Sequence, residues 1–377
     1  VYEVKKVYQN IHFKAVDFAS DKVQITNLFD FTNLKEYRIK WKIKADGKIV
    51  DQGTLPEIDL HPHQDTVISL GLPKINAESG TEYFLWIEAF PIKSNTFFNE
   101  DHVIAWEQFL FPATKEKVKT NPVASGPLLL KENESAITIS NTDLSLTFNK
   151  ISGNLSNFNF KGTPFLKEDL QLNFWRAVTD NDIGNSLQVR CAVWKNAGST
   201  AKLKTITTKQ LNPQQVQVDV VYDLTDVSSQ STISYLVNSN GDVKVKASFI
   251  AGEKTLPELP RFGLRLILNK EFETVKWLGR GPFDNYNDRN YAAAVDVYEM
   301  SASNLFHPYP RAQESGNRTD VRWMALSNSK GQGIMAIGNS LLNAGVLHFD
   351  MRKMDFDHNK RQNVHGGSMA DEDLIWW

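Results

Sequence analysis

The sequence predicts an all-β protein built from two sandwich domains. Apolar and polar residues alternate with a period of two along most of the chain, which places them on opposite faces of strands. Short clusters rich in Gly, Asn and Asp separate these stretches and favour turns. Aromatic residues, which pack well on pleated surfaces, make up 11% of the 377 residues.

The first domain, residues 1–115, is expected to be an immunoglobulin- or fibronectin-like β-sandwich. Apolar residues alternate with lysines from Ile39 to Ala45, which predicts a half-buried strand. Asp46-Gly47 follows and predicts a hairpin turn. Further strands are expected at residues 23–26, 66–70 and 83–89.

Composition changes after this domain. Residues 116–127 are rich in Pro and charge and short of large apolar side chains, so an interdomain linker is expected, with a long surface loop as the alternative. Alternation then resumes, and residues 128–377 are expected to form one large antiparallel sandwich. Its clearest strands are expected at residues 136–140, 144–148, 216–220 and 243–247.

Composition also excludes several classes of function. A net charge of −2 does not favour nucleic acid or an anionic membrane as a partner, and no apolar run approaches a membrane span. A single cysteine, Cys191, excludes an internal disulfide and a cysteine-based metal site. Phosphate-binding loops and a nucleophile elbow are missing from the sequence. His61 and His63 are expected to face solvent rather than a metal.

Three polar clusters of the second domain remain as candidates for chemistry. The first, residues 174–185, contains Arg176 and the run Asp180-Asn181-Asp182, which predicts a tight turn rich in acceptors. Such a turn would hold sugar hydroxyls, a cation or an arginine. The alternative is a turn that satisfies its own backbone and pairs with Arg176.

The second cluster spans residues 277–289, where Gly and Pro force a turn before Asn285, Asp288 and Arg289. The third spans residues 313–323. Its alternation predicts Arg318, Asp320 and Arg322 on one face of a strand, and charge pairs between strands are favoured there over catalysis.

In this order, the clusters resemble the C-terminal portion of the glycoside hydrolase family 2 β-galactosidases. Arg-Ala-x-x-Asp-Asn-Asp-x-Gly is found at residues 176–184, and Gly-Pro-x-x-Asn-Tyr-x-Asp-Arg at 281–289. Between them lies Leu-Pro-Arg-x-Gly, which contains Arg261. After them comes Glu-x-Gly-x-Arg, which begins at Glu314. Two further matches occur at residues 102–108 and 147–155, and it is the occurrence of all six in order that carries the resemblance.

The resemblance implies a parent enzyme of five domains. Residues 1–115 resemble the fourth domain, an immunoglobulin-like sandwich, and residues 128–377 the fifth, a galactose-mutarotase-like sandwich truncated at its C-terminus. Both catalytic glutamates of the family lie on a TIM barrel that would precede Val1, so no catalytic residue is expected here. The family's Mg and Na ions are bound outside this portion, and its members commonly form homo-oligomers.

Site residues are also carried over by resemblance. Six belong to a loop at the rim of the parent active site, in which Gly184 would serve as a hinge: Asp180, Asn181, Asp182, Gly184, Asn185 and Ser186. Eight more form a candidate polar, sugar-facing cluster: Arg176, Arg261, Asn285, Asp288, Arg289, Glu314, Arg318 and His348.

The chain opens in mid-pattern at Val1 without an initiator Met, and its C-terminal residues 374–377 resemble the strand just before the family's Gly-Gly-Asp-x-Ser-Trp segment. Both ends are therefore expected to be truncated, and Trp376 and Trp377 are not expected to be the sugar platform.

The resulting expectation is a non-catalytic part of a β-galactosidase that supports the barrel, subunit contacts and the active-site rim, with the barrel and a β-galactoside or galactose as partners. One alternative is a galactose-binding module. Another is an aldose 1-epimerase-like activity, for which Glu314 and His348 are the nearest acid–base pair. The sequence does not indicate a cellular compartment.

Overall fold

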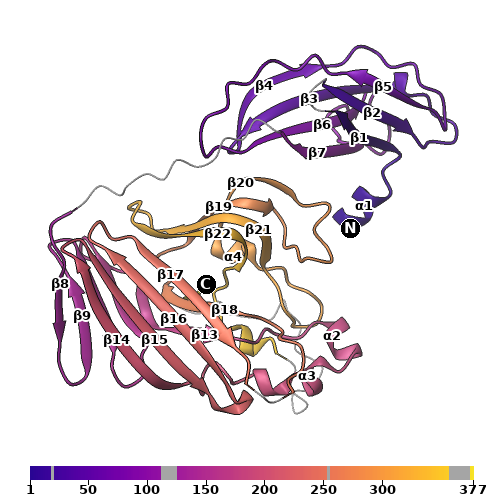
Figure 1. The fold of residues 1–377 in the computed structure, drawn as a ribbon. Coiled ribbons are helices and arrows are strands. Elements are labelled where there is room, and N and C mark those ends of the chain that lie inside the picture. The colour runs from indigo at the N-terminus through magenta and orange to yellow at the C-terminus, as the bar shows by residue number, and fades with distance from the viewer. Residues whose placement is uncertain (18–20, 112–124, 253–254, 356–373) are drawn as a thin grey trace. The chain divides into compact units, whose positions relative to one another are not determined.

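The computed structural model describes the chain except for residues 18–20, 112–124, 253–254 and 356–373 (Figure 1). The described residues form six β-sheets and a few short helices, which confirms the all-β prediction. None of these helices is long and apolar enough to cross a membrane. Contacts divide the chain into two compact units.

The first unit contains a two-layer sandwich. One sheet has the order β1 (Ile11–Asp17), β2 (Lys22–Asn27), β5 (Asp65–Ser69), and the other the order β4 (Lys48–Thr54), β3 (Tyr37–Ala45), β6 (Tyr83–Pro91), β7 (Ala105–Leu110). Helix α1 (Tyr2–Val7) precedes them, and a 3₁₀ turn, η2 (Leu34–Glu36), leads into β3. Each predicted strand of this domain is present.

Strand β3 shows why the sandwich forms. Ile39, Trp41 and Ile43 are buried, while the lysines between them are not. Asp46 and Gly47 have φ angles of 42° and 82°, the left-handed pair that turns β3 tightly into β4. The buried side chains of both sheets pack into one core.

The second unit is built on three further sheets. Five strands have the order β12 (Thr163–Pro164), β11 (Leu155–Phe160), β10 (Leu144–Asn149), β9 (Ala136–Ser140), β8 (Leu129–Glu132). Four long strands follow in sequence order, β14 (Lys202–Asn212), β15 (Gln215–Leu224), β16 (Ser229–Asn238), β17 (Val243–Ile250). The third sheet pairs β13 (Leu166–Asn173), β18 (Gly263–Asn269) and β23 (Leu374–Trp376).

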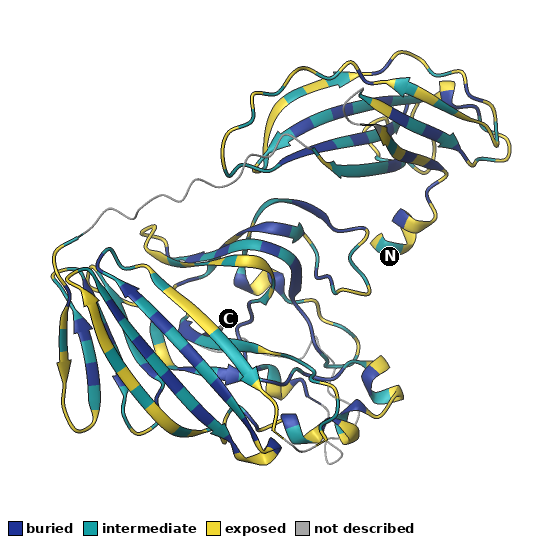
Figure 2. Ribbon diagram, viewed as in Figure 1, coloured by how far each residue is buried: buried dark blue, intermediate teal, exposed yellow. Residues whose placement is uncertain are grey.

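These sheets share one apolar core. In β15 and β16 alternate residues are buried along the whole strand, as the banding of Figure 2 shows. Phe148 of β10 meets Tyr235 of β16 edge to face, with ring centroids 5.0 Å apart. The core also takes in side chains from α2 (Asp180–Gly184) to η3 (Ala192–Trp194), with α3 (Leu187–Arg190) between them.

A fourth sheet has the order β20 (Ala294–Ser301), β19 (Thr274–Gly281), β21 (Asn317–Ser327), β22 (Gly333–Gly345). Residues 277–298 and 319–322 of this region group with the first unit, so the units do not follow a single cut in the sequence. Short helical turns complete the chain, η4 (Thr225–Val227), α4 (Ala302–Leu305) and η5 (Met351–Lys353). Most of the predicted linker, residues 116–127, lies outside the described residues, so the domain boundaries and the mutarotase-like subtype stay predictions.

Candidate functional site

The first polar cluster is organised by Asp182. Its carboxylate accepts a hydrogen bond from Nη2 of Arg176 at 3.0 Å and one from the backbone N–H of Thr179 at 2.8 Å. The Thr179 hydroxyl in turn accepts from the Asp182 N–H, which completes a capping box at the start of α2. Burial would raise the pKa of Asp182, but the hydrogen bonds from Arg176 and Thr179 outweigh it and lower the pKa.

This segment was expected to form a tight turn, and that expectation is wrong in detail. Residues 180–184 form α2 and residues 187–190 form α3. The spacing Thr179-x-x-Asp182 is a capping-box pattern and was the missed signal. The alternative expectation, a pairing between this segment and Arg176, is confirmed.

The other residues of the predicted rim loop face outward. Asp180, Asn181, Gly184, Asn185 and Ser186 are exposed. Asp180 accepts hydrogen bonds from Arg311 at 3.3 Å and from Gln313 at 3.2 Å, and Asn185 accepts two from Arg190. The cluster therefore has an inner carboxylate that fixes α2 and an outer polar surface.

The unusual backbone of this loop lies at Ser186 rather than at Gly184. Gly184 is the last residue of α2, and its φ is not in the left-handed region. Ser186 has φ 62° and separates α2 from α3. A non-glycine residue in this conformation is uncommon, so Ser186 is the strained position of the loop.

Arg261, Glu314 and His348 form two separate pairs. Glu314 is buried and accepts from Arg261 at 2.6 Å. His348 is also buried, and its two ring nitrogens contact the Glu273 carboxylate and, at 3.2 Å, the Leu374 carbonyl oxygen. The structure thus pairs His348 with Glu273, whereas the epimerase hypothesis named Glu314.

Three of the predicted cluster residues belong to the first unit. Asn285 is fully buried, and its Oδ1 accepts from the Thr319 N–H at 2.9 Å and from the Thr319 hydroxyl at 2.6 Å. Arg289 lies 3.5 Å from the buried Asp284, while Asp288 is exposed. Asn285 is therefore a structural amide that holds two backbone segments together.

The third cluster confirms charge pairing between strands. Asp320 pairs with Arg280 of β19 at 2.6 Å. Arg322 donates two hydrogen bonds, of 2.6 and 3.1 Å, to the carboxylate of Glu82, the residue just before β6. Arg318 is almost completely buried and donates to the Gly316 carbonyl at 3.0 Å. The regular alternation expected here is interrupted, because Asp320 has φ 52°.

Two buried carboxylates were missed by sequence reasoning. Asp355 accepts from the Trp175 indole N–H at 2.9 Å and pairs with Lys195 at 2.6 Å. Asp350 caps η5 and pairs with Arg352. The partners of Asp355 are 180 and 160 residues away, so no local motif marks it, whereas Asp350 binds Arg352 only two residues further on.

Taken together, the buried carboxylates of the second unit bind cations and N–H groups that fix loops. Within the described ranges, no group of three or more His, Cys, Asp or Glu side chains is placed to hold a metal ion. His61 and His63 are exposed, as expected, and His63 lies 3.0 Å from Asp30.

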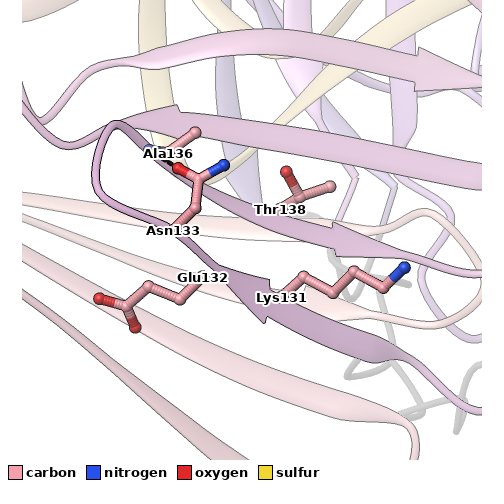
Figure 3. Close-up of a pocket in the computed structure, with 5 residues that line it drawn as sticks. All are labelled: Lys131, Glu132, Asn133, Ala136 and Thr138. Carbon is pink, nitrogen blue, oxygen red and sulfur yellow. Dashed lines mark hydrogen bonds between the residues drawn. The ribbon is translucent and has the colours of Figure 1, made fainter.

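A hollow of about 430 Å³ lies on the β8–β9 hairpin of the second unit (Figure 3). Lys131, Glu132, Asn133, Ala136 and Thr138 line it, and none of these five is aromatic. Asn133 Oδ1 accepts from the Ala136 N–H at 2.7 Å, so its amide is used to shape the hairpin. The hollow contains none of the predicted site residues.

Family models match most of the chain. The model described as β-galactosidase small chain matches residues 140–370, and the model described as β-galactosidase, domain 4, matches residues 23–112. The match to the small-chain model contains all fourteen predicted site residues, which lie between residues 176 and 348.

Curated relatives agree. A β-galactosidase of Priestia megaterium is 31% identical over 95% of this chain, and one of Lactobacillus delbrueckii subsp. bulgaricus is 28% identical over 93%. A β-galactosidase of Pseudoalteromonas haloplanktis is 29% identical over 83%. The chain spans about a third of the length of these relatives, with coverages of 34%, 34% and 31%.

Proposed function

This chain belongs to the β-galactosidase family, and on that premise we propose that it is a non-catalytic part of an enzyme that hydrolyses terminal β-galactosides with retention. In this proposal both catalytic carboxylates, the barrel that carries them and the Mg and Na ions of the parent lie in polypeptide outside this chain. The chain supports the barrel, contributes to contacts in a homo-oligomer and lends its α2–α3 loop to the active-site rim.

The observation that carries this proposal is the use made of the buried carboxylates. Retaining hydrolysis needs one carboxylate free to attack the sugar and a second, protonated one about 5–5.5 Å away. Asp182 and Glu314 are instead each held by an arginine, and the pKa of Asp182 is lowered, which makes it a poor proton donor. These bonds stabilise loops and leave little freedom for chemistry.

The outer surface of the α2–α3 loop supports the rim role. Asp180, Asn181, Asn185 and Ser186 present acceptors and amides at the surface, and Asp182 anchors the helix from below. Such a loop has the polar groups that bind sugar hydroxyls, positioned on a capped helix.

The test is an assay of the purified chain with a chromogenic β-galactoside, with calorimetric titration of galactose and a polarimetric mutarotation assay beside it. We expect no turnover, no binding heat at millimolar galactose and no mutarotation above background. Turnover would contradict the proposal outright. Binding heat alone would favour the galactose-binding module, and mutarotation alone the epimerase.

A further inference from the structure

The side chain of Lys6 is enclosed in the first unit by groups that recognise an ammonium ion. Its Nζ lies 2.9 Å from Oε2 of Glu107, 4.1 Å from the ring centroid of Trp106 and 4.8 Å from that of Tyr291. It also donates to the Trp106 carbonyl oxygen. Only 1% of the Lys6 side chain is exposed.

The walls of this enclosure are themselves held in place. The Tyr291 hydroxyl donates to Glu107 Oε2 at 3.0 Å, so one carboxylate oxygen faces both the ammonium and the phenol. The Trp106 ring stacks on Trp86, with centroids 5.6 Å apart. Burial, followed by the charge of Glu107, raises the pKa of Tyr291 to about 12, which keeps the phenol protonated as a donor.

The chemistry of the enclosure is specific. Two aromatic faces attract a cation through the ring quadrupole, with Trp the strongest of the side chains, and a carboxylate neutralises its charge. Burial lowers the pKa of Lys6, and Glu107 opposes that change. An ammonium buried in this way is stabilised by its surroundings only when its charge is paired.

We propose that Trp106, Glu107 and Tyr291 form an alkylammonium-binding site, and that Lys6 fills it as an internal ligand carried by α1. Helix α1 then acts as a clip, by which we mean that it joins β7, through Lys6, to residues 291–292, through Glu3. Its Glu3, one turn before Lys6, accepts from the backbone N–H groups of Tyr291 and Ala292 at 3.1 and 2.9 Å.

The clip has a structural consequence. Lys6 binds β7, whose Trp106 and Glu107 are part of the first sandwich, while Glu3 binds residues 291–292. Much of the remaining helix surface is exposed, with Val4 and Val7 both more than half exposed. The bound ammonium is therefore the main buried anchor of α1, and emptying the site should loosen residues 291–292.

Chemical rescue tests the proposal on the whole 377-residue chain. In Lys6→Ala, amide hydrogen exchange at Tyr291 and Ala292 should accelerate about tenfold or more, and methylammonium chloride should restore protection in a saturable manner. Sodium chloride at equal concentration should not. Lys5→Ala is the matched control, because Lys5 lies on the same helix but contacts His102. Methylammonium should leave the amide exchange of Tyr291 and Ala292 unchanged in this variant.

Two outcomes would overturn the proposal: unchanged exchange in Lys6→Ala, or rescue by methylammonium no greater than by sodium chloride. If Lys6→Ala does not fold, Trp106→Phe and Trp106→Met decide with Lys6 in place. The aromatic variant should retain more protection at residues 291–292 than the methionine variant, and equal losses would show that the ring does not bind the ammonium.

Discussion

The carboxylate of Asp182 is almost fully buried, yet it carries its charge because Arg176 and Thr179 replace the water it has lost. Glu314, Asp350 and Asp355 are buried with comparable partners. At this scale, the buried carboxylates serve mainly to hold loops, and the sequence candidates Asp182 and Glu314 are among them. A buried charge that loses its partner costs far more than an exposed one, so these positions should be sensitive to substitution.

Asp182→Asn should destabilise the chain by about 1.5–3 kcal/mol at neutral pH, because it removes charge-assisted hydrogen bonds. The pKa of Asp182 is lowered in the fold, so its charge contributes stability above the ordinary aspartate pKa. That contribution is lost as the pH falls through the lowered value. Denaturant unfolding near pH 7 and at about pH 3 should therefore show a variant effect that shrinks in acid.

Asp180→Asn is the control for this experiment. Asp180 is exposed and its ion pair with Arg311 is 3.3 Å long, so its replacement should cost less than about 1 kcal/mol. Equal losses in the two variants, or a loss in Asp182→Asn that persists in acid, would contradict the role given to Asp182.

Among the elements, the α2–α3 loop begins with a capped helix N-terminus and has a residue with strained backbone between its two helices. Thr179 and Asp182 cap α2, and Ser186 interrupts the helical path with a left-handed φ of 62°. Gly184 has no such constraint, and a Cβ added there would meet no atom within 4 Å. If this loop moves when the parent binds sugar, the backbone at Ser186 is the better candidate for the moving point.

Gly184→Ala should stabilise α2 by about 0.5–1 kcal/mol, because alanine loses less backbone entropy in a helix. Ser186→Gly should be neutral or stabilising, since glycine adopts positive φ without steric cost. Thermal unfolding of the two variants checks both expectations. A clear loss of stability in Gly184→Ala would show that Gly184 needs a conformation other than the helical one.

For the molecule as a whole, the main difference from the sequence prediction is that the first unit includes segments from far along the chain, residues 277–298 and 319–322. Residues 277–298 group with the first sandwich, and several polar side chains bridge the two. Gln108 of β7 forms two hydrogen bonds to the backbone of Val295, donating at 2.7 Å and accepting at 2.9 Å. Lys44 of β3 pairs with Asp296. The sandwich and this distant segment therefore belong to one compact unit.

Gln108→Ala should accelerate amide exchange at Val295 about tenfold, because the variant loses both hydrogen bonds at a cost of about 1–2 kcal/mol. Hydrogen exchange read out by mass spectrometry would measure this. Gln24→Ala is the control, since Gln24 is bonded at 2.8 Å to Asp65 on an exposed surface of the same sandwich. Unchanged exchange at Val295 would show that Gln108 does not hold the segment.

The sequence by itself determined the strands, because side chains two residues apart lie on the same face of a strand and a buried face therefore appears as alternating apolar residues. Ile39 to Ala45, the Asp46-Gly47 turn and the run from Val216 to Val220 follow from that local pattern. The ordered motifs also indicated the family, since a series of motifs in fixed order needs no coordinates.

Only the tertiary structure decided the partners of the charged groups. Trp175 and Asp355 are 180 residues apart, and Lys6 and Glu107 are 101 apart. Such pairs depend on how sheets pack and loops meet, and no periodicity between neighbouring residues encodes them. For the same reason the sequence assigned Glu314 and His348 to one hypothetical pair, whereas packing gave each a different partner.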